Sequence, residues 1–211
     1  MKKFYLITLV LTWIGIGLHA QTFDGGLTVG AVTSQINGDG YAGFHQLGCT
    51  AGVFGRIPTE GHSSWQMELK YSLFGAHSSV DEVNYGLNPM SIRLHYLELP
   101  LLFHYNLGGL NINGKTLDFI TFELGLSGDF LIRGTQSANF DANFDNKAWL
   151  FFSVTGNVGL QFDLNDHLGI DIRSMNSLTP CRLTPGAGSY FLHSFNIALQ
   201  ATLVYTIFHA N

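Results

Sequence analysis

Residues 94–105, LHYLELPLLFHY, constrain the fold of this chain more than any other stretch. From Leu97 onward the odd positions are all hydrophobic, whereas the even positions include Glu98, Pro100 and His104. A period of two is that of a β-strand, whose successive side chains point to opposite faces. A strand with one hydrophobic face, and with a carboxylate and a proline on the other, requires an unusual environment. The wall of a membrane β-barrel, with lipid outside and a polar interior, provides one.

The start of the chain has the pattern of a secretory signal peptide. Two lysines precede an apolar run over residues 4–18, and Ala20 is a small residue before a cleavage site. The run is shorter than the roughly 20 residues of a spanning helix, which disfavours a membrane anchor. Because the next residue is Gln21 rather than cysteine, we expect no N-terminal lipid anchor. We therefore assign residues 1–20 to a signal peptide and residues 21–211 to one outer-membrane β-barrel domain.

The charge balance limits the possible partners. Loss of the two N-terminal lysines with the leader leaves 8 basic residues against 15 acidic ones. This balance argues against nucleic acid, or an anionic membrane surface, as the main partner. Only 12% of residues are charged, whereas 25 are glycine and 17 are phenylalanine. That composition, with no long apolar run after the leader, favours strands in which apolar and polar residues alternate.

Eight segments show this alternation, which predicts an all-β, eight-stranded, antiparallel up-and-down transmembrane β-barrel. They are residues 23–33, 46–56, 65–73, 94–105, 122–133, 152–163, 168–173 and 195–207. After a short first link, the connections run short, long, short-to-medium, long, short and long. Outer-membrane barrels have short periplasmic turns and long outer loops. We therefore expect the links at residues 36–43, 76–90, 134–147 and 176–189 to lie outside the cell, and both chain ends in the periplasm.

The polar face distinguishes a membrane barrel from a soluble barrel or sandwich, the competing all-β fold. It carries charges of both signs, which can pair inside a closed eight-stranded barrel but would be penalised against lipid. We predict a polar, plugged interior with a structural charge network of Glu68, Lys70, Glu98, Glu123, Asp129, Arg133, Asp171 and Arg173. The opposite face supplies aromatic residues for two interfacial girdles, among them Trp65, Tyr71, Tyr105, Phe130, Phe152, Phe162, Phe195 and Tyr205.

The run Tyr96-Leu97-Glu98-Leu99-Pro100 resembles the Tyr-Leu-Glu-Ile-Pro strand of PorT-like outer-membrane β-barrel proteins, with Leu99 in place of the usual isoleucine. The resemblance extends loosely over residues 21–211. It implies a small integral barrel in an outer membrane of the Bacteroidota type. The namesake of the family is associated with type IX protein secretion, whereas most relatives have no assigned activity.

Two residues of this motif raise structural questions. Pro100 has no N–H to donate, and a closed barrel has no free edge on which to place it. We therefore expect a β-bulge near Tyr96 or Pro100, which would also turn Arg93 and His95 inward. Glu98 is expected to pair with an interior cation such as Lys70, Arg93 or Arg173.

Three further patterns are weak candidates for sites. Asp141, Asn143 and Asp145 match the first half of a calcium-binding loop. Asn146 stands where that loop needs glycine, and Phe152 where it needs a bidentate glutamate, so we interpret this segment as a polar loop. The eight histidines after the leader show no metal-ligand spacing. Cys49 and Cys181 fall on segments that are not neighbours, which favours two unpaired thiols over a disulfide. We expect no metal and no cofactor.

A lipid deacylase built on a Ser-His-acid set is the enzymatic alternative. His62 with Ser64, and His77 with Ser79 and Glu82, are the candidate groups, and nothing in the sequence fixes their geometry. We predict a non-enzymatic structural or interaction module, possible partners being outer-membrane lipid and other envelope or secretion proteins. We expect a monomeric barrel. A narrow pore or an adhesin is the third hypothesis.

Overall fold

The structure is a computed structural model, and it describes residues 23–38, 43–59, 61–86, 89–109, 111–112, 115–138, 149–183 and 193–208. The long strands are β1 (Asp24–Asn37), β2 (Gln46–Pro58), β3 (Ser63–His77), β4 (Met90–Asn106), β7 (Ile120–Ala138), β8 (Phe152–Asp163), β9 (Leu168–Ser177) and β11 (His193–Phe208). The shorter elements are α2 (Val80–Asn84), η1 (Leu107–Gly109), β5 (Asn111–Ile112), β6 (Lys115–Thr116) and β10 (Arg182–Leu183). The predicted leader, residues 1–20, lies outside the described residues.

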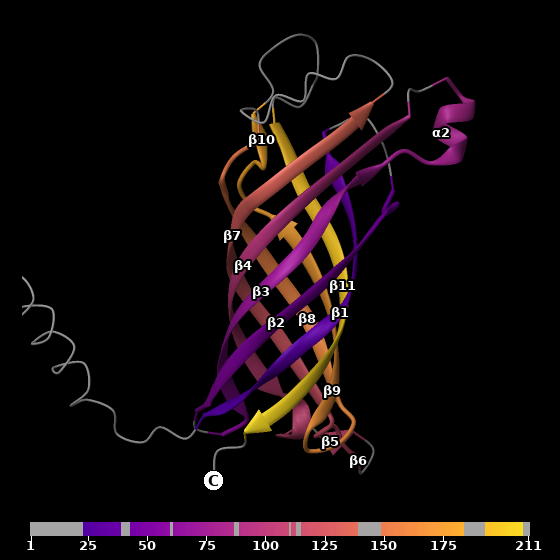
Figure 1. The fold of residues 1–211 in the computed structure, drawn as a ribbon. Coiled ribbons are helices and arrows are strands. Elements are labelled where there is room, and N and C mark those ends of the chain that lie inside the picture. The colour runs from indigo at the N-terminus through magenta and orange to yellow at the C-terminus, as the bar shows by residue number, and fades with distance from the viewer. Residues whose placement is uncertain are drawn as a thin grey trace, which may run out of the picture.

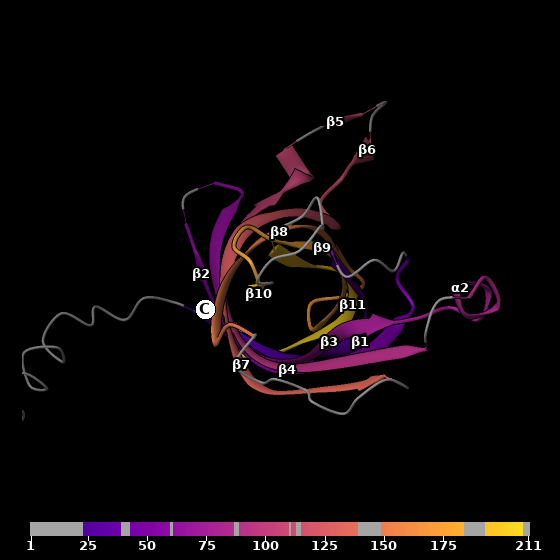
Figure 2. The same ribbon diagram turned by 90° about the horizontal axis from the view of Figure 1, so that it is seen from above.

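Each long strand pairs antiparallel with the next, and β11 pairs with β1 from Gly25↔Phe208 to Asn37↔Phe195. The eight long strands therefore form a closed ring, which Figure 2 shows from above. Closure leaves no free sheet edge along the paired length of the wall. The predicted eight-stranded up-and-down barrel is confirmed, and each predicted strand falls in one of these elements, apart from Phe23, which precedes β1.

The connections divide between the two ends of the barrel. The long links after β3, β7 and β9 lie at the end with α2 and β10, whereas the start of β1, the end of β11 and one further long link, residues 107–119 with β5 and β6, lie at the other end (Figure 1). We call these the loop end and the terminus end. No helix among the described residues is long and apolar enough to cross a membrane.

The predicted alternation of faces is confirmed in residues 97–105. Leu97, Leu99, Leu101 and Tyr105 are exposed on the outside of the barrel, whereas Glu98 and the other even-numbered side chains are buried. Aromatic residues gather on the outside at two levels. Trp65, Tyr105, Phe122 and Tyr205 are exposed toward the terminus end, and Phe152 packs on Phe130 nearer the loop end. Two such levels are typical of interfacial girdles.

Pro100 is accommodated by a local gap in the ladder between β3 and β4. The pairing runs in one register from Ser63↔Tyr105 to His77↔Ser91, but Glu68 and Leu69 have no paired residues on β4. A proline cannot donate the N–H that this ladder would need. The gap leaves the register unchanged on both sides of it.

The bulge lies opposite Tyr96, in β7 rather than in β4. Register partners change from His95↔Arg133 to Tyr96↔Leu131, so Ile132 is the extra residue. Because β4 itself keeps its alternation, Arg93 stays exposed and His95 half-buried on the outer face. The prediction that a shift turns these two side chains inward is therefore wrong. Instead, the inserted Ile132 changes which face of the wall the following residues of β7 point to.

Candidate functional site

The middle of the lumen holds a cluster of buried charges, which we call the interior charge network. Its members come from four strands, and each side chain is almost fully buried: Glu68, Lys70, Glu98, Glu123, Asp129, Asp171 and Arg173. These are seven of the eight residues that the sequence placed inside. Each lies at an inward position of a regular alternating strand, which is why a periodicity of two located them.

Arg173 is the centre of the network. Its guanidinium donates to both carboxylate oxygens of Glu68, Nη1 to Oε2 at 3.1 Å and Nη2 to Oε1 at 3.0 Å. The same group lies 3.0 Å from Glu123 Oε2 and 2.9 Å from Asp171 Oδ2. A planar guanidinium with five donors suits such convergent carboxylates better than a lysine would.

Lys70 organises the second half of the network. Its Nζ lies 3.5 Å from Glu68 Oε2 and 3.7 Å from Glu98 Oε2, and it donates to Gln200 Oε1 at 2.9 Å. Ser72 also donates to Glu98. Of the three cations expected to pair with Glu98, the structure therefore selects Lys70.

Asp129 has hydroxyl partners instead of a close cation. Ser127 donates to its Oδ1 at 2.8 Å, and Thr155 donates to its Oδ2. Glu98 and Asp129 are register partners on β4 and β7. The network thus brings five carboxylates together with two basic side chains, and hydroxyl donors stabilise part of the surplus acid.

Three contacts join strands that lie diametrically opposite in the ring, and we call them the cross-lumen bridges. Arg173 of β9 reaches Glu68 of β3, as described above. Toward the terminus end, Arg56 Nη2 of β2 donates to Gln161 Oε1 of β8 at 2.8 Å. Toward the loop end, Asn196 of β11 donates to the hydroxyl of Tyr96 on β4 at 3.2 Å. Side chains therefore span the lumen at three levels.

Arg133, the eighth predicted member, is not in the network. Its side chain is exposed on the outside of β7. The extra residue Ile132 moves Arg133 to the outward parity, where it is the register partner of His95. The prediction of an interior position for Arg133 is therefore wrong, and the bulge is the physical reason.

The loop end of the lumen is apolar, and we call its buried cluster the apolar plug. It comprises Val32, Ile36, Phe74, Ala76, Ile92, Leu94, Tyr96, Trp149, Met175, Cys181 and Ala198. Cys181 enters from outside the wall strands, and its N–H donates to Ser194 O at 2.8 Å. Trp149 forms a bridge with Arg182, whose guanidinium carbon lies 5.2 Å from the centre of the indole. Segments from two connections therefore fill this end.

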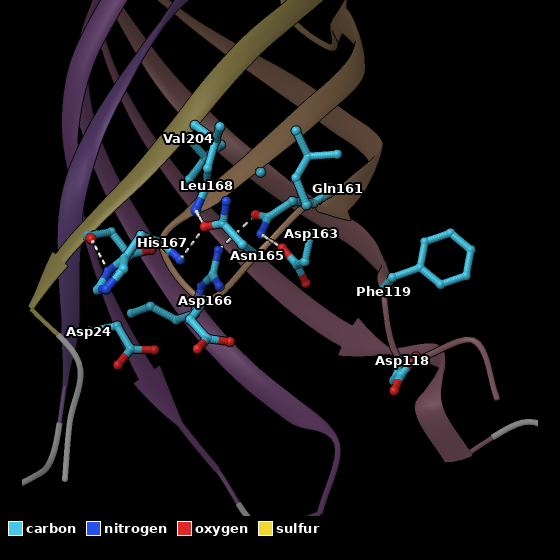
Figure 3. A pocket seen from close by; sticks show the side chains of 14 residues that line it. Asp24, Asp118, Phe119, Gln161, Asp163, Asn165, Asp166, His167, Leu168 and Val204 are labelled. Atoms are coloured by element: carbon cyan, nitrogen blue, oxygen red, sulfur yellow. Dashed lines mark hydrogen bonds between the residues drawn. The ribbon is translucent and has the colours of Figure 1, made fainter.

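A pocket of about 420 Å³ opens at the terminus end (Figure 3). Its lining includes Asp24, Asp163 and Asp166, and the bridge from Arg56 to Gln161 is its floor toward the network. Gln161 also donates to Asp163 Oδ1 at 2.5 Å. Asn165 accepts from two backbone N–H groups of its own turn. The pocket is thus the blind mouth of the lumen, bounded by groups that already hydrogen-bond one another.

Two of the candidate catalytic groups, Ser79 and Glu82, have a structural role at the start of α2. Ser79 is the N-cap of α2 and accepts from the N–H of Glu82 at 3.2 Å, while Glu82 accepts from the N–H of Ser79 at 2.7 Å. This reciprocal pair is a capping box. His77 is exposed at the end of β3. His62 lies at the opposite end of that strand, next to Ser64 of the β3 ladder.

The metal candidates give no site within the described residues. No group of three or more His, Cys, Asp or Glu side chains in those ranges could hold a metal ion. Asp141, Asn143, Asp145 and Asn146 lie outside the described residues, and Phe152 is a lipid-face residue of β8. Neither Cys49, which is exposed, nor Cys181, which is buried, is in a disulfide.

The sequence analysis did not assign roles to Arg56, Gln161 and Asn196, although all three are polar residues of the wall strands. Their parity predicts that they face inward, but not that each reaches the strand opposite. That information depends on how the ring closes.

Comparisons with known proteins agree with this architecture. A family model described as outer membrane protein beta-barrel domain matches residues 18–181. Among solved structures, Neisserial surface protein A has a TM-score of 0.50 at 8% identity, covering 87% of this chain and 97% of that one. Ail of Yersinia pestis, solved with the heparin analogue sucrose octasulfate, has a TM-score of 0.47 at 11% identity, covering 88% and 99%.

OprG of Pseudomonas aeruginosa has a TM-score of 0.36 at 13% identity, covering 90% of this chain and 95% of that one. No curated protein matches the sequence. At 8% identity the likeness to Neisserial surface protein A concerns the fold alone.

Proposed function

This chain belongs to the outer membrane protein beta-barrel domain family, and from that premise we propose that it is a closed, non-enzymatic structural or interaction module of the outer membrane. The observation that carries the proposal is the stack of three cross-lumen bridges beneath an apolar plug. A lumen that is filled with paired charges and capped by packed side chains offers no continuous aqueous path. The molecule would then act through its outer surface and its loops.

Planar-bilayer conductance tests closure. We expect no steady channel from the purified wild-type protein. The Arg56→Ala/Arg173→Ala double variant removes the basic partner from two bridges and should conduct more than wild type if it still folds. Arg133→Ala is the matched control, because it removes an exposed arginine and leaves the lumen intact. Steady conductance of the wild type would overturn the proposal in favour of the narrow pore.

The absence of catalysis is the second part of the proposal. The capping box supports it, because the hydroxyl of Ser79 already accepts the N–H of Glu82, its would-be acid partner. Incubation of the purified protein with outer-membrane lipid should release no fatty acid. Acyl release that disappears in His77→Ala and persists in His62→Ala would establish the deacylase alternative.

The orientation follows from the loop lengths. Because three of the four links at the loop end are long, whereas two of the three at the terminus end are short, we propose that the loop end faces outside and that both chain ends lie in the periplasm. Single cysteines in place of Tyr85 and of Asp166, in a Cys49→Ser background, would test it. An impermeant maleimide added to whole cells should label the first and spare the second.

The loop end is also the proposed interaction surface. Val80 is the first residue of α2 and is 77% exposed, and Tyr85 follows the helix and is 90% exposed. An aliphatic and an aromatic side chain are therefore accessible to a partner at this helix. Exposed aromatics are common anchors of protein interfaces. The resemblance of the motif from Tyr96 to Pro100 to PorT-like barrels favours protein export as the process served.

A photo-crosslinker at Tyr85, used in the native outer membrane, should give a discrete adduct that Val80→Asp weakens. The same probe at Leu126 on the lipid face is the control. If the export role holds, a strain that lacks this protein should retain the proteins that it normally exports. Normal export in that strain would limit the role to a structural one.

A further inference from the structure

The outer half of β7 differs from the rest of the barrel wall. Strand β8 pairs with β7 only up to Phe130↔Phe152, followed by one further hydrogen bond from Leu131 N to Phe151 O at 2.8 Å. Beyond that point no described residue of β8 continues the ladder, because the chain leaves the wall and places Trp149 in the apolar plug. Among the described residues, no strand therefore closes the wall between β7 and residue 151 on the outside of the barrel.

A cleft of about 540 Å³ occupies this opening. Its lining is Leu131, Ile132, Arg133, Gly134, Thr135, Trp149 and Phe151. Ile132 and Phe151 are 63% and 69% exposed, whereas Trp149 is buried in the plug. The cleft thus leads from the lipid-facing surface to Trp149 of the apolar plug. A lining of this kind would accept a hydrocarbon chain.

Arg133 is the charged residue of that lining, and the bulge at Ile132 is what turns it outward. Its guanidinium has no hydrogen bond or ion pair with any described residue. Arginine forms strong bidentate hydrogen bonds with phosphate. An apolar cleft beside a guanidinium that no described residue pairs with matches a molecule that joins a phosphate to an acyl chain.

The depth of Arg133 in the membrane agrees with this match. Outward residues of β7 run from Phe122 to Ile132, ten residue steps. At about 3.4 Å per residue and a tilt near 45°, ten steps span roughly 25 Å, the height of the apolar band of such barrels. Arg133 comes directly after this band, at the level of lipid headgroups.

We propose that this cleft binds an anionic lipid of the surrounding membrane whose headgroup is a terminal phosphate, with that phosphate at Arg133 and one acyl chain against Ile132, Phe151 and Trp149. The acidic net charge of the chain does not oppose this, because the site is local and the interior carboxylates are buried behind the wall. Arg93 lies close by on β4 as the register partner of Thr135, is also exposed, and does not line the cleft. It is therefore a matched control.

The test uses the fluorescence of Trp149. The sequence has three tryptophans, and a Trp13→Phe/Trp65→Phe background leaves Trp149 as the reporter. The protein is reconstituted in phosphatidylcholine bilayers that contain a minority of lipid with brominated acyl chains, which quench tryptophan on contact. The brominated lipid is phosphatidic acid in one series and phosphatidylcholine in the other.

We expect brominated phosphatidic acid to quench Trp149 at about one-fifth of the concentration needed for phosphatidylcholine, the selectivity that one interfacial arginine can supply. Arg133→Gln should remove this preference, Arg133→Lys should keep most of it, and Arg93→Gln should leave it unchanged. Heat-modifiable gel migration verifies that each variant is folded.

Three results would overturn the proposal. The first is no quenching of Trp149 by either lipid, which would mean that no acyl chain enters the cleft. The second is equal quenching by the two lipids in wild type. The third is an equal loss of preference in Arg133→Gln and Arg93→Gln, which would indicate general surface electrostatics. Closure of the lumen is measured separately by conductance, so either proposal can fail without the other.

Discussion

Arg173 and Glu68 lie on strands that face each other across the diameter of the barrel, and two parallel hydrogen bonds of 3.1 and 3.0 Å join them. The pair fixes the separation of opposite walls as well as neutralising charge. Its environment excludes water, since both side chains are almost completely buried. Removing either side chain would leave the other as an unpaired buried charge, which lowers the stability of the fold.

Arg173→Ala should lower the free energy of unfolding by roughly 3–5 kcal/mol, because it leaves three carboxylates near one another without their shared cation. Urea unfolding in detergent or in lipid, followed by tryptophan fluorescence, measures the change. Arg93→Ala, at an exposed arginine, serves as the control, with an expected shift of no more than about 0.5 kcal/mol. Equal effects of the two variants would contradict the assignment of Arg173 to the centre of the network.

Gly75→Ala should prevent folding or reduce stability by at least about 1–3 kcal/mol. Gly75 has a φ of +153°, and a Cβ added there would lie 1.9 Å from the carbonyl oxygen of Ile92. Its N–H also donates to Ser34 Oγ at 2.9 Å, which holds the backbone in place. Gly55→Ala is the comparison, because nothing lies within 4 Å of its added Cβ. The yield of heat-modifiable protein distinguishes the two, and an equal yield would count against the close approach at Gly75.

Ser79→Ala should loosen α2 while leaving the barrel unchanged. It removes the side-chain acceptor of the capping box, worth about 1 kcal/mol at a helix N-terminus. Faster amide exchange at Glu82, or faster proteolysis between residues 79 and 86, is the expected readout. Asn84→Ala, at the other end of the helix, should change little. Unchanged exchange in Ser79→Ala would mean that packing rather than capping stabilises this helix.

The two thiols should react in different states of the protein. Cys49 is exposed on the outside of β2, whereas Cys181 is fully buried in the apolar plug. A lipid-soluble maleimide should therefore modify Cys49 in the folded barrel, and Cys181 only after unfolding. Mass spectrometry counts the adducts. Unfolded, unreduced protein with no reactive thiol would show that the two cysteines form a disulfide instead.

Much of the wall could be predicted from local pattern. Alternation in residues 97–105 assigns each side chain to the inside or the outside, because the pleat of a strand has a period of two wherever the backbone is regular. The same argument located Glu68, Asp171 and Arg173 in the lumen before any partner was known. Where one residue is inserted the argument fails, and Arg133 shows this.

The sequence by itself determined the number of strands, the face of nearly every strand residue and the ends to which short and long connections go. Each of these depends on neighbours within a few residues. Only the tertiary structure decided which charges meet across the lumen, that Trp149 and Cys181 fill its loop end, and that Ile132 is the extra residue of β7. Those outcomes depend on contacts that form when distant strands pair and the ring closes, so no local pattern contains them.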